Sequence, residues 1–304
     1  MIPNFPEFKT LELSDRVEIE SITKQFPPYS DYHFPLMYIW DIHEPILLSV
    51  LNNNLIIRHS DALTGESFYS FIGTNAIEET INKISIFLKE NNFPTTLKLI
   101  PEEIIKNLNG FASSAVEDRD NHDYIFDIEK IFHSKGNGFR HYRNHINKFE
   151  KKYSNITTNP IDLTDSIVKT QITNLFNTWS ENRISDNKAG NLIFENKALN
   201  KLLSSANEFK SLSSLGLYDK NKLIAFSIFD FINKDFALCS FLLANKTFEG
   251  SFQYLMKETI NLLHKQDVKF LNFEADCGVS SWREYKMLYR PPFFLKKYTI
   301  ESCN

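Results

Sequence analysis

Apolar residues in the first half of the chain follow two different spacings. Residues 46–51, 55–58 and 68–72 are short apolar runs separated by three consecutive asparagines and by Gly65, a pattern typical of strands joined by tight turns. Residues 76–90 repeat apolar side chains every three or four positions, which predicts an amphipathic helix. The other elements predicted in this half are a strand at residues 96–100 and helices at residues 11–25 and 102–108.

The second half repeats this plan loosely. Its predicted elements are helices at residues 167–182, 194–206 and 251–264 and strands at residues 213–218, 223–230 and 236–243. No repeat is visible in the sequence itself, so the similarity of the two halves rests on the order of their elements. With 304 residues, the chain is long enough for two modest domains, and we place the boundary near residues 110–125.

The last strand predicted before the C-terminal region, residues 268–276, changes character along its length. Side chains two positions apart share one face of a strand. On one face two apolar residues are followed by Asn272, Glu274 and Asp276. A strand that leaves a packed interior and ends in carboxylates predicts the floor of a cleft.

A short helix that carries cations is predicted directly after this strand. Gly278 ends the strand, and Ser281 with Glu284 three residues later makes a capping box. The polar side chains on this helix are Arg283, Lys286 and Tyr289. The acids and the cations form either a structural ion-pair cluster at a strand-to-helix corner or a functional site, and the pattern fits both.

Composition indicates a globular protein. Hydrophobic residues make up 42% of the chain and include 27 Phe, enough to fill a sizeable core. No run approaches the roughly 18 apolar residues of a membrane helix, and the N-terminus lacks the regions of a signal peptide. Three scattered cysteines fit neither a disulfide framework nor a zinc site. We therefore expect a soluble, cytoplasmic protein that needs no metal or other cofactor.

Charge is divided unequally along the chain. Residues 1–129 carry 9 Lys and Arg against 21 Asp and Glu, a balance of −12, whereas residues 130–304 carry 25 against 17, a balance of +8. Such a division can mark an anionic partner for the basic part, or it can let the two halves attract each other.

One segment concentrates the positive charge. Residues 130–152 hold seven Lys and Arg against a single acid, Glu150, and helical spacing from Phe139 onward predicts a buried apolar stripe. Arg143 would then sit at the edge of a cleft. The pattern fits an ordinary amphipathic helix with a basic outer face. It also fits a phosphate contact, to the 3′ end of a tRNA or to a lipid head group, for which arginine has the better geometry.

Three ordered blocks of the chain resemble the C-terminal domain family of the phosphatidylglycerol lysyltransferases. Residues 272–278, NFEADCG, with Arg283 and Lys286, resemble its Asn-x-Glu-x-Asp-x-Gly and Leu-Arg-x-x-Lys signatures. Residues 123–153 resemble its Asp-Tyr-x-Tyr segment followed by Lys-Arg-Asn-x-Ile-x-x-Phe, and residues 30–40, SDYHFPLMYIW, resemble its Ser-Asp-x-x-Phe-x-x-x-Tyr-x-Trp opening. The blocks extend across nearly the whole chain.

This resemblance implies an α+β fold of two tandem acetyltransferase-like units, each a mixed, mostly antiparallel sheet flanked by helices. We expect the first unit at residues 1–120 and the second, which carries most of the site, at residues 121–304. The family is similar in fold to the aminoacyl-tRNA-dependent peptidoglycan-bridge ligases. It implies a transferase that moves an aminoacyl group from aminoacyl-tRNA to a hydroxyl or amine on a lipid head group, a peptide or a metabolite.

In the reaction that the resemblance implies, Glu274 or Asp276 removes the acceptor's proton or holds the aminoacyl ammonium group, and Asn272 orients it. The side chains expected to bind substrate or phosphate, or to stabilise the developing oxyanion, are Arg143, Asn144, Arg283, Lys286 and Tyr289. Family lysyltransferases carry a membrane flippase ahead of this domain. This chain shows no transmembrane segment, so we expect an acceptor reached from the cytosol, with peripheral membrane contact left open.

Two other functions stay open on the sequence alone. An acyl-CoA-dependent N-acyltransferase would cradle the pyrophosphate of its substrate in a glycine-rich loop before a helix, and residues 245–251, NKTFEGS, offer only Gly250 for that purpose. A non-catalytic binding module of the same fold is the second alternative.

Overall fold

The computed structural model of the chain describes residues 1–61, 63–108, 115–185 and 192–301, except for the side chains of residues 182, 184 and 185. The chain divides into two compact units. The first comprises Met1–Asp123, Ala275–Val279 and Phe294–Asn304, and the second comprises Tyr124–Glu274 and Ser280–Phe293. The tandem units expected at residues 1–120 and 121–304 stay a prediction.

The first sheet has seven strands in the order β1-β2-β3-β4-β5-β14-β6. Their bounds are β1 Lys9–Thr10, β2 Leu47–Leu51, β3 Asn54–Ser60, β4 Ser67–Ile72, β5 Thr96–Pro101, β6 Ala115–Glu117 and β14 Lys297–Glu301. β4 and β5 pair in parallel, and the other neighbours pair antiparallel. The three short apolar runs of the first half are β2, β3 and β4, as the spacing predicted.

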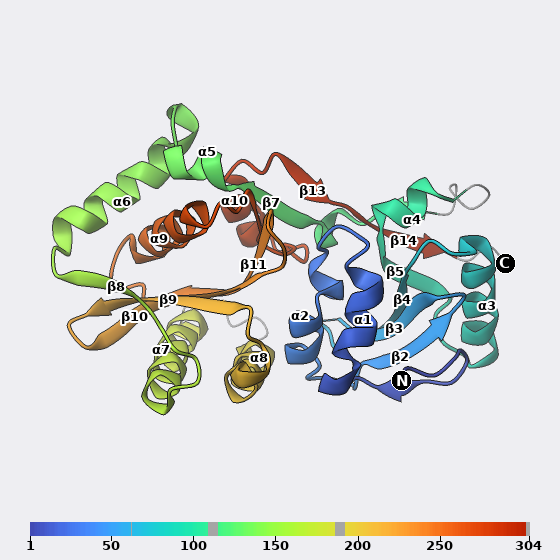
Figure 1. Cartoon of the computed structure of the whole chain (residues 1–304). Coiled ribbons are helices and arrows are strands. Elements are labelled where there is room, and N and C mark those ends of the chain that lie inside the picture. Colours follow the sequence, from blue (N-terminus) through green and yellow to red (C-terminus); the bar gives the residue numbers. More distant parts are fainter. Residues whose placement is uncertain (62, 109–114, 186–191, 302–304) are drawn as a thin grey trace. The chain divides into compact units, whose positions relative to one another are not determined.

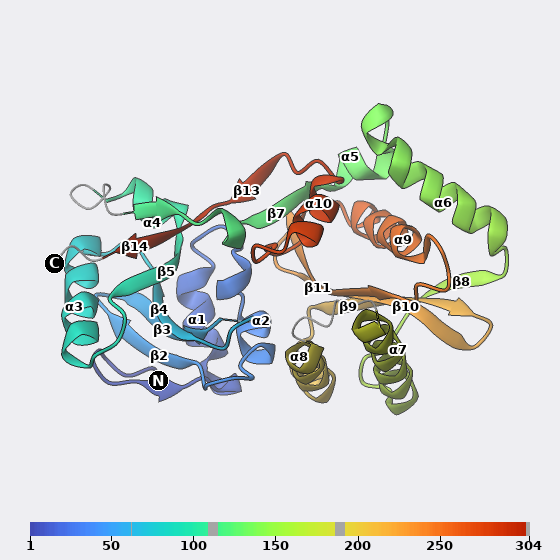
Figure 2. The ribbon, with the colours of Figure 1, turned by 180° about the vertical axis from the view of Figure 1, so that it is seen from behind.

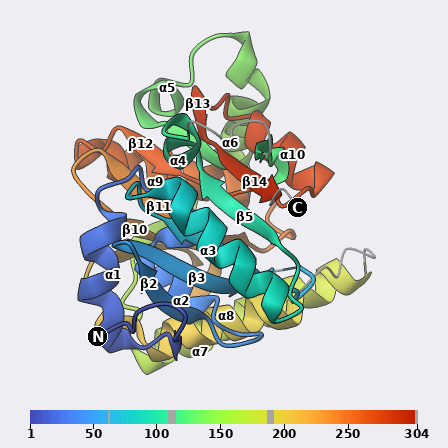
Figure 3. The same ribbon diagram turned by 90° about the vertical axis from the view of Figure 1, so that its right-hand side faces the viewer.

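Helices cover both faces of the first sheet. Their bounds are α1 Arg16–Thr23, α2 Phe34–Ile39, α3 Ile77–Glu90 and α4 Glu102–Lys106. α3 lies across one face (Figure 3), where its stripe of Ile81, Ile84 and Leu88 packs with Ile56 and Phe71 in one buried cluster. α1 and α2 lie against the opposite face (Figure 1). The predicted helix at residues 76–90 is therefore confirmed.

The C-terminal strand is an inner strand of the first sheet. β14 lies between β5 and β6, and its first residue, Lys297, is aligned with Pro101 of β5. Lys297 and Ile300 are both buried, so a lysine enters the interior of the first unit. This strand was not predicted.

The second sheet also has seven strands, in the order β13-β7-β12-β11-β10-β9-β8. Their bounds are β7 Asp123–Asp127, β8 Ile156–Pro160, β9 Leu212–Asp219, β10 Lys222–Phe231, β11 Phe236–Ala244, β12 Phe270–Asn272 and β13 Phe293–Leu295. β12 pairs in parallel with β11 and antiparallel with β7, and the pairs from β11 to β8 are antiparallel. Two mixed, mostly antiparallel sheets flanked by helices confirm the predicted fold class.

Among the described residues, helices cover both faces of the second sheet, and one further helix lies between β12 and β13 along the chain. Figures 1 and 2 show α5, α6 and α9 on one face and α7 and α8 on the other. The bounds are α5 Ile128–His133, α6 Arg140–Lys152, α7 Ser166–Ser185, α8 Leu192–Ser204, α9 Ser251–Lys265 and α10 Ser280–Met287. No helix within the described ranges is long and apolar enough to span a membrane.

The apolar stripe predicted for residues 139–149 is confirmed. Phe139, Tyr142, Ile146 and Phe149 are all buried, and the ring of Phe149 stacks on that of Tyr254 in α9 at 4.7 Å. α6 is thus an amphipathic helix with a charged outer face.

Candidate active site

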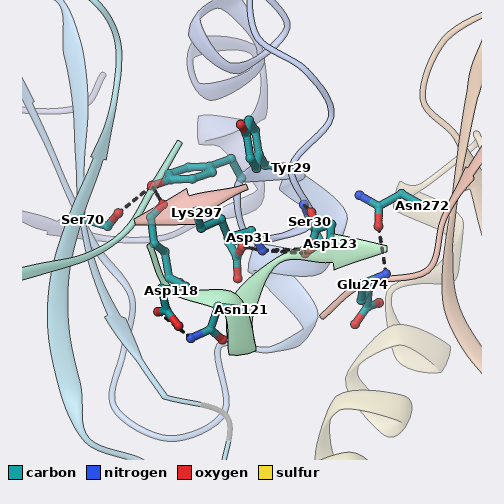
Figure 4. A network of polar contacts seen from close by, with 12 residues as sticks. Tyr29, Ser30, Asp31, Ser70, Asp118, Asn121, Asp123, Asn272, Glu274 and Lys297 are labelled. Carbon is teal, nitrogen blue, oxygen red and sulfur yellow. Dashed lines mark hydrogen bonds and ion pairs between the residues drawn. The ribbon is translucent and has the colours of Figure 1, made fainter. Parts of the chain in front are cut away.

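The predicted strand at residues 268–276 is wrong beyond Asn272. β12 is three residues long and ends at Asn272. The buried side chain of Asn272 accepts the backbone N–H of Glu274 through Oδ1 at 2.8 Å (Figure 4). Glu274 adopts φ +54°, a left-handed conformation that few residues other than glycine adopt. The chain therefore turns at Glu274, and no single strand face presents Asn272, Glu274 and Asp276.

Lys286 holds this turn from α10. Its Nζ donates to the carbonyl oxygens of Phe273 at 2.6 Å and Glu274 at 3.1 Å, and the residue is only 8% exposed. The ammonium also lies over the rings of Tyr124 and Phe273, at 5.6 and 5.4 Å from their centroids. A buried ammonium with carbonyl and aromatic partners fixes the backbone that carries Glu274.

The carboxylate of Glu274 is partly enclosed by the protein. The residue is half-buried and its Oε1 atom is buried. Burial, and then the negative charge of Glu274, raise the pKa of the Cys239 thiol on β11 well above its ordinary value. Cys239 therefore belongs to the surroundings of Glu274 as a neutral thiol. Nothing in the sequence singled out Cys239, because the strand that carries it is far away along the chain.

Tyrosines extend this polar cluster within the second unit. The hydroxyl groups of Tyr285 and Tyr289 form a hydrogen bond with each other, and Tyr142 of α6 meets the ring of Tyr289 edge-on at 5.5 Å. Tyr289 is buried and stacks on Phe126 at 5.0 Å. Burial raises the pKa of both hydrogen-bonded phenols, so they stay neutral near pH 7. The i, i+4 spacing of the two tyrosines was a usable signal for Tyr285 that the sequence analysis missed.

Asp276 belongs to the first unit, whereas Glu274 belongs to the second. Its buried carboxylate accepts the N–H of Gly278 at 2.9 Å and pairs with Arg119 at 3.4 Å. Gly278 has φ +74° and lies so close to Asp120 that a Cβ would come within 2.9 Å of its carboxylate. Asp276 thus shapes the turn in which it sits. Arg119 is a charged partner that was not predicted.

Arg143 does not contact Glu274. Its guanidinium donates to the carbonyl oxygens of Ser134 and, at 2.9 Å, of Gly136. It therefore fixes the loop that joins α5 to α6. Asn144, the next residue on α6, is exposed, and Arg283 on α10 is half-buried.

A second polar cluster is buried in the first unit. Lys297, 1% exposed, forms ion pairs with Asp31 and, at 2.8 Å, with Asp123, and Ser30 donates to Asp123 from its backbone N–H at 2.7 Å and its hydroxyl at 2.6 Å (Figure 4). Burial alone would lower the pKa of Lys297, but the two carboxylates outweigh it and raise that pKa. The cluster joins the Ser30–Asp31 block, the Asp123 block and the C-terminal strand, so these motif residues brace the first unit internally.

Gly250, in the loop at residues 245–251, packs against α6. Gly250, at φ +88°, lies so close to α6 that a Cβ would come within 2.7 Å of the His145 carbonyl oxygen and 3.1 Å of Phe149 Cβ. The N–H of Ser251 donates to the Phe248 carbonyl at 2.9 Å. Close helix packing therefore explains this glycine without a bound phosphate.

Comparison with known proteins defines the class. The family model for the C-terminal domain of phosphatidylglycerol lysyltransferase matches residues 23–301. The chain belongs to this family, as the three sequence blocks indicated. Membership supports a transferase function of the aminoacyltransferase type.

Solved structures share the fold. A conserved protein of unknown function from Bacteroides thetaiotaomicron is 23% identical, with a TM-score of 0.82 over 98% of this chain and 99% of that chain. The C-terminal domain of a putative lysylphosphatidylglycerol synthetase from Agrobacterium fabrum is 11% identical, with a TM-score of 0.65 over 96% and 93%. L-PGS from Bacillus licheniformis is also 11% identical, with a TM-score of 0.62 over 100% and 94%. At these identities the likeness establishes the fold.

A sequence relative covers less of the chain. An uncharacterized protein from Mycoplasmoides gallisepticum is 24% identical over 180 residues, which are 59% of this chain. The match spans 55% of the length of that relative.

Proposed function

We propose that this chain transfers an aminoacyl group from aminoacyl-tRNA to a hydroxyl or amine acceptor and that Glu274 is the general base. The observation that carries the proposal is the position of Glu274. Its carboxylate sits half-buried on a turn that Asn272 and Lys286 hold from both sides. A base whose backbone is fixed in this way needs little reorganisation when it accepts a proton.

The reaction forms one bond and breaks another. The acceptor oxygen or nitrogen attacks the carbonyl carbon of the aminoacyl ester while Glu274 takes the acceptor's proton. The new ester or amide bond forms as the bond between that carbonyl carbon and the ribose oxygen of the tRNA breaks. Glu274 then returns the proton to the ribose oxygen, so no oxidant, reductant or metal ion enters the balance.

The other candidate residues support Glu274 in this scheme. Asn272 and Lys286 are positioning residues, because their side chains hydrogen-bond the backbone of the turn. Tyr289, paired with Tyr285, supplies a neutral hydroxyl for a substrate polar group. Arg283 stabilises negative charge that develops on the carbonyl oxygen.

Three candidates act further from the chemistry. Asp276 is the alternative base. Its carboxylate already accepts the N–H of Gly278 and pairs with Arg119. Arg143 contributes through the loop that it fixes, and Asn144 through the exposed face of α6.

The acceptor is proposed by chemical class. A hydroxyl or amine on a lipid head group, a peptide or a metabolite would satisfy the attack on the ester. The family description favours a phospholipid head group. The packing of α6 against Gly250 speaks against acyl-CoA as the donor.

The proposal is tested with a charged total-tRNA pool. Purified protein is incubated with the pool and with three acceptor sets: phosphatidylglycerol vesicles, a peptide mixture and a metabolite extract. Mass spectrometry of each set should reveal one product heavier by an aminoacyl residue. Acetyl-CoA in place of the tRNA pool should give no product. An acetylated product, or no product with any acceptor set, would contradict the proposed function.

A further inference from the structure

An open cavity of about 660 Å³ lies in the second unit away from the turn of Glu274. It is bounded by α5, by the loop that leads into α6 and by the residue that follows α10 closely, Arg290. Lys130, Lys135 and Arg290 converge on it from these three segments. The cavity therefore collects three cations that come from distant parts of the chain.

These cations are available to a ligand. All three residues are exposed, and within the part of the chain that the structure describes none of them forms an ion pair with a carboxylate. The Nζ of Lys130 makes only a long hydrogen bond, 3.4 Å, to the carbonyl oxygen of Arg290. Unpaired cations around one cavity attract an anion through their summed field.

The two acids that also line the cavity are engaged elsewhere. Asp127 caps α5 by accepting the N–H of Lys130 at 2.9 Å. Glu129 faces two imidazoles, His133 at 2.9 Å and His264 at 2.8 Å. The lining still carries three cations against two carboxylates, a formal balance of +1 with neutral histidines.

Gly138 makes room for the guanidinium of Arg290. A Cβ at Gly138 would come within 2.0 Å of the Arg290 guanidinium, so this arginine can lie across the loop only because residue 138 has no side chain. Gly136 has φ +82° with nothing within 4 Å of the position of a Cβ, and Arg143 ties the loop from its other side. The loop between α5 and α6 and the side chain of Arg290 together form one wall of the cavity.

Cations continue from the cavity along the outer face of α6. The exposed residues of this stripe are Arg140, Asn144, Lys148, Lys151 and Lys152, spaced so that they follow one side of the helix. α6 has 13 residues and thus extends for about 20 Å. A single phosphate group could use only the cavity, whereas a strand of linked phosphates could contact both the cavity and the helix.

We infer that this cavity binds a backbone phosphate of an RNA strand that continues along the basic face of α6. Arg290 contacts the phosphate with its planar donor pair, and Lys130 and Lys135 add point charges. The inference rests on the proposed function for one point, the identity of that RNA as the donor tRNA. The phosphate site itself follows from the cavity and its cations.

The test measures binding of fluorescently labelled, deacylated tRNA by anisotropy at salt concentrations from 50 to 300 mM. The pocket variant combines Lys130→Ala, Lys135→Ala and Arg290→Asn, where asparagine suits the left-handed conformation of residue 290 at φ +54°. Each lost phosphate contact removes about 0.7 from the slope of log affinity against log salt for a single strand. The cavity holds one backbone phosphate, so we expect the slope to fall by about 0.7 and the affinity at 150 mM salt to fall at least tenfold.

Two controls separate geometry from net charge. The variant Lys89→Ala, Lys222→Ala, Lys234→Ala removes three exposed cations elsewhere and should leave the slope unchanged. Gly138→Ala keeps every charge but displaces Arg290, and it should weaken tRNA binding several-fold. Equal slopes in the pocket variant and the charge control would overturn the inference, as would unaltered binding in Gly138→Ala.

Binding of a lipid head group in the cavity, in place of an RNA phosphate, would also overturn the inference. In that case the pocket variant would lose binding to vesicles of phosphatidylglycerol and phosphatidylcholine while keeping its affinity for tRNA. The proposed function fails separately, because tRNA binding is measured without transfer. An inactive protein whose tRNA binding responds to the pocket variant contradicts the proposed function only, and active transfer with an unchanged KM for tRNA in the pocket variant contradicts this inference only.

Discussion

The ammonium nitrogen of Lys286 lies 2.6 Å from the carbonyl oxygen of Phe273 and 3.1 Å from that of Glu274. A lysine that the sequence marks as a candidate for binding substrate therefore holds the backbone of the turn on which Glu274 is presented. The pairing links α10 to the end of β12 and explains why a cation is buried at this corner.

Lys286→Met should lower the free energy of unfolding by about 2 kcal/mol, because two buried carbonyl groups lose a charged donor. Urea titration measures the change. Lys265→Met, at the exposed end of α9, is the matched control and should change stability by less than about 0.5 kcal/mol. Equal stabilities of the two variants would mean that Lys286 does not support the turn.

Removing one partner of the ion pair between Lys297 and Asp123 should strongly lower the free energy of unfolding. Asp123→Asn and Lys297→Met should each lower the free energy of unfolding by about 3 to 5 kcal/mol, since the first leaves Lys297 with Asp31 alone and the second leaves two carboxylates without their cation. The double variant should lose clearly less than the two single losses added together. Strict additivity in denaturant titrations would show that the two residues are energetically independent.

His59 should make stability depend on pH. Burial, and then the charge of Lys297, lower the pKa of His59 to about 4, while an unfolded histidine titrates near 6.5. Between these values the unfolded chain binds more protons than the folded one. The contribution of His59 is therefore complete above about pH 6.5 and is lost as the pH falls toward 4, by about 1.4 kcal/mol per pH unit.

The measurement compares wild type with His59→Gln by urea unfolding from pH 7.5 to 4. The difference between the two proteins isolates the histidine, because other acids titrate in both. We expect the free energy of the wild type to fall more steeply than that of the variant below pH 6.5. Parallel curves would show that His59 takes up its proton as readily in the folded state as in the unfolded state.

The spacing of apolar residues along the sequence was sufficient to predict much of the fold. The strands β2, β3 and β4 and the helix α3 follow directly from apolar periodicity, since each buries one face against its own neighbours. The C-terminal strand β14 could not be found in this way. It is five residues long and is defined by pairing with segments about 180 to 200 positions earlier, a choice that no local pattern encodes.

The sequence predicted only part of the candidate site. Alternation placed Asn272, Glu274 and Asp276 on one strand face, but the Asn272 side chain competes with the backbone ladder by accepting the N–H of Glu274. That hydrogen bond turns the chain. The resemblance pointed to Asn272, Glu274 and Lys286, which share one turn in the structure. Cys239 comes near Glu274 only through the fold, whereas Tyr285 is marked in the sequence by its i, i+4 spacing to Tyr289.

The most direct test of the account replaces the proposed base. Glu274→Gln keeps the shape of the side chain but cannot accept a proton, and Glu284→Gln on the exposed side of α10 is its control. The measurement is the rate of aminoacyl transfer from charged tRNA together with the melting temperature of each variant. We predict a fall of about 10²- to 10⁴-fold in the rate for Glu274→Gln, with a melting temperature within a few degrees of wild type. A rate within a few-fold of wild type, or a loss of stability large enough to explain the loss of transfer, would contradict the account.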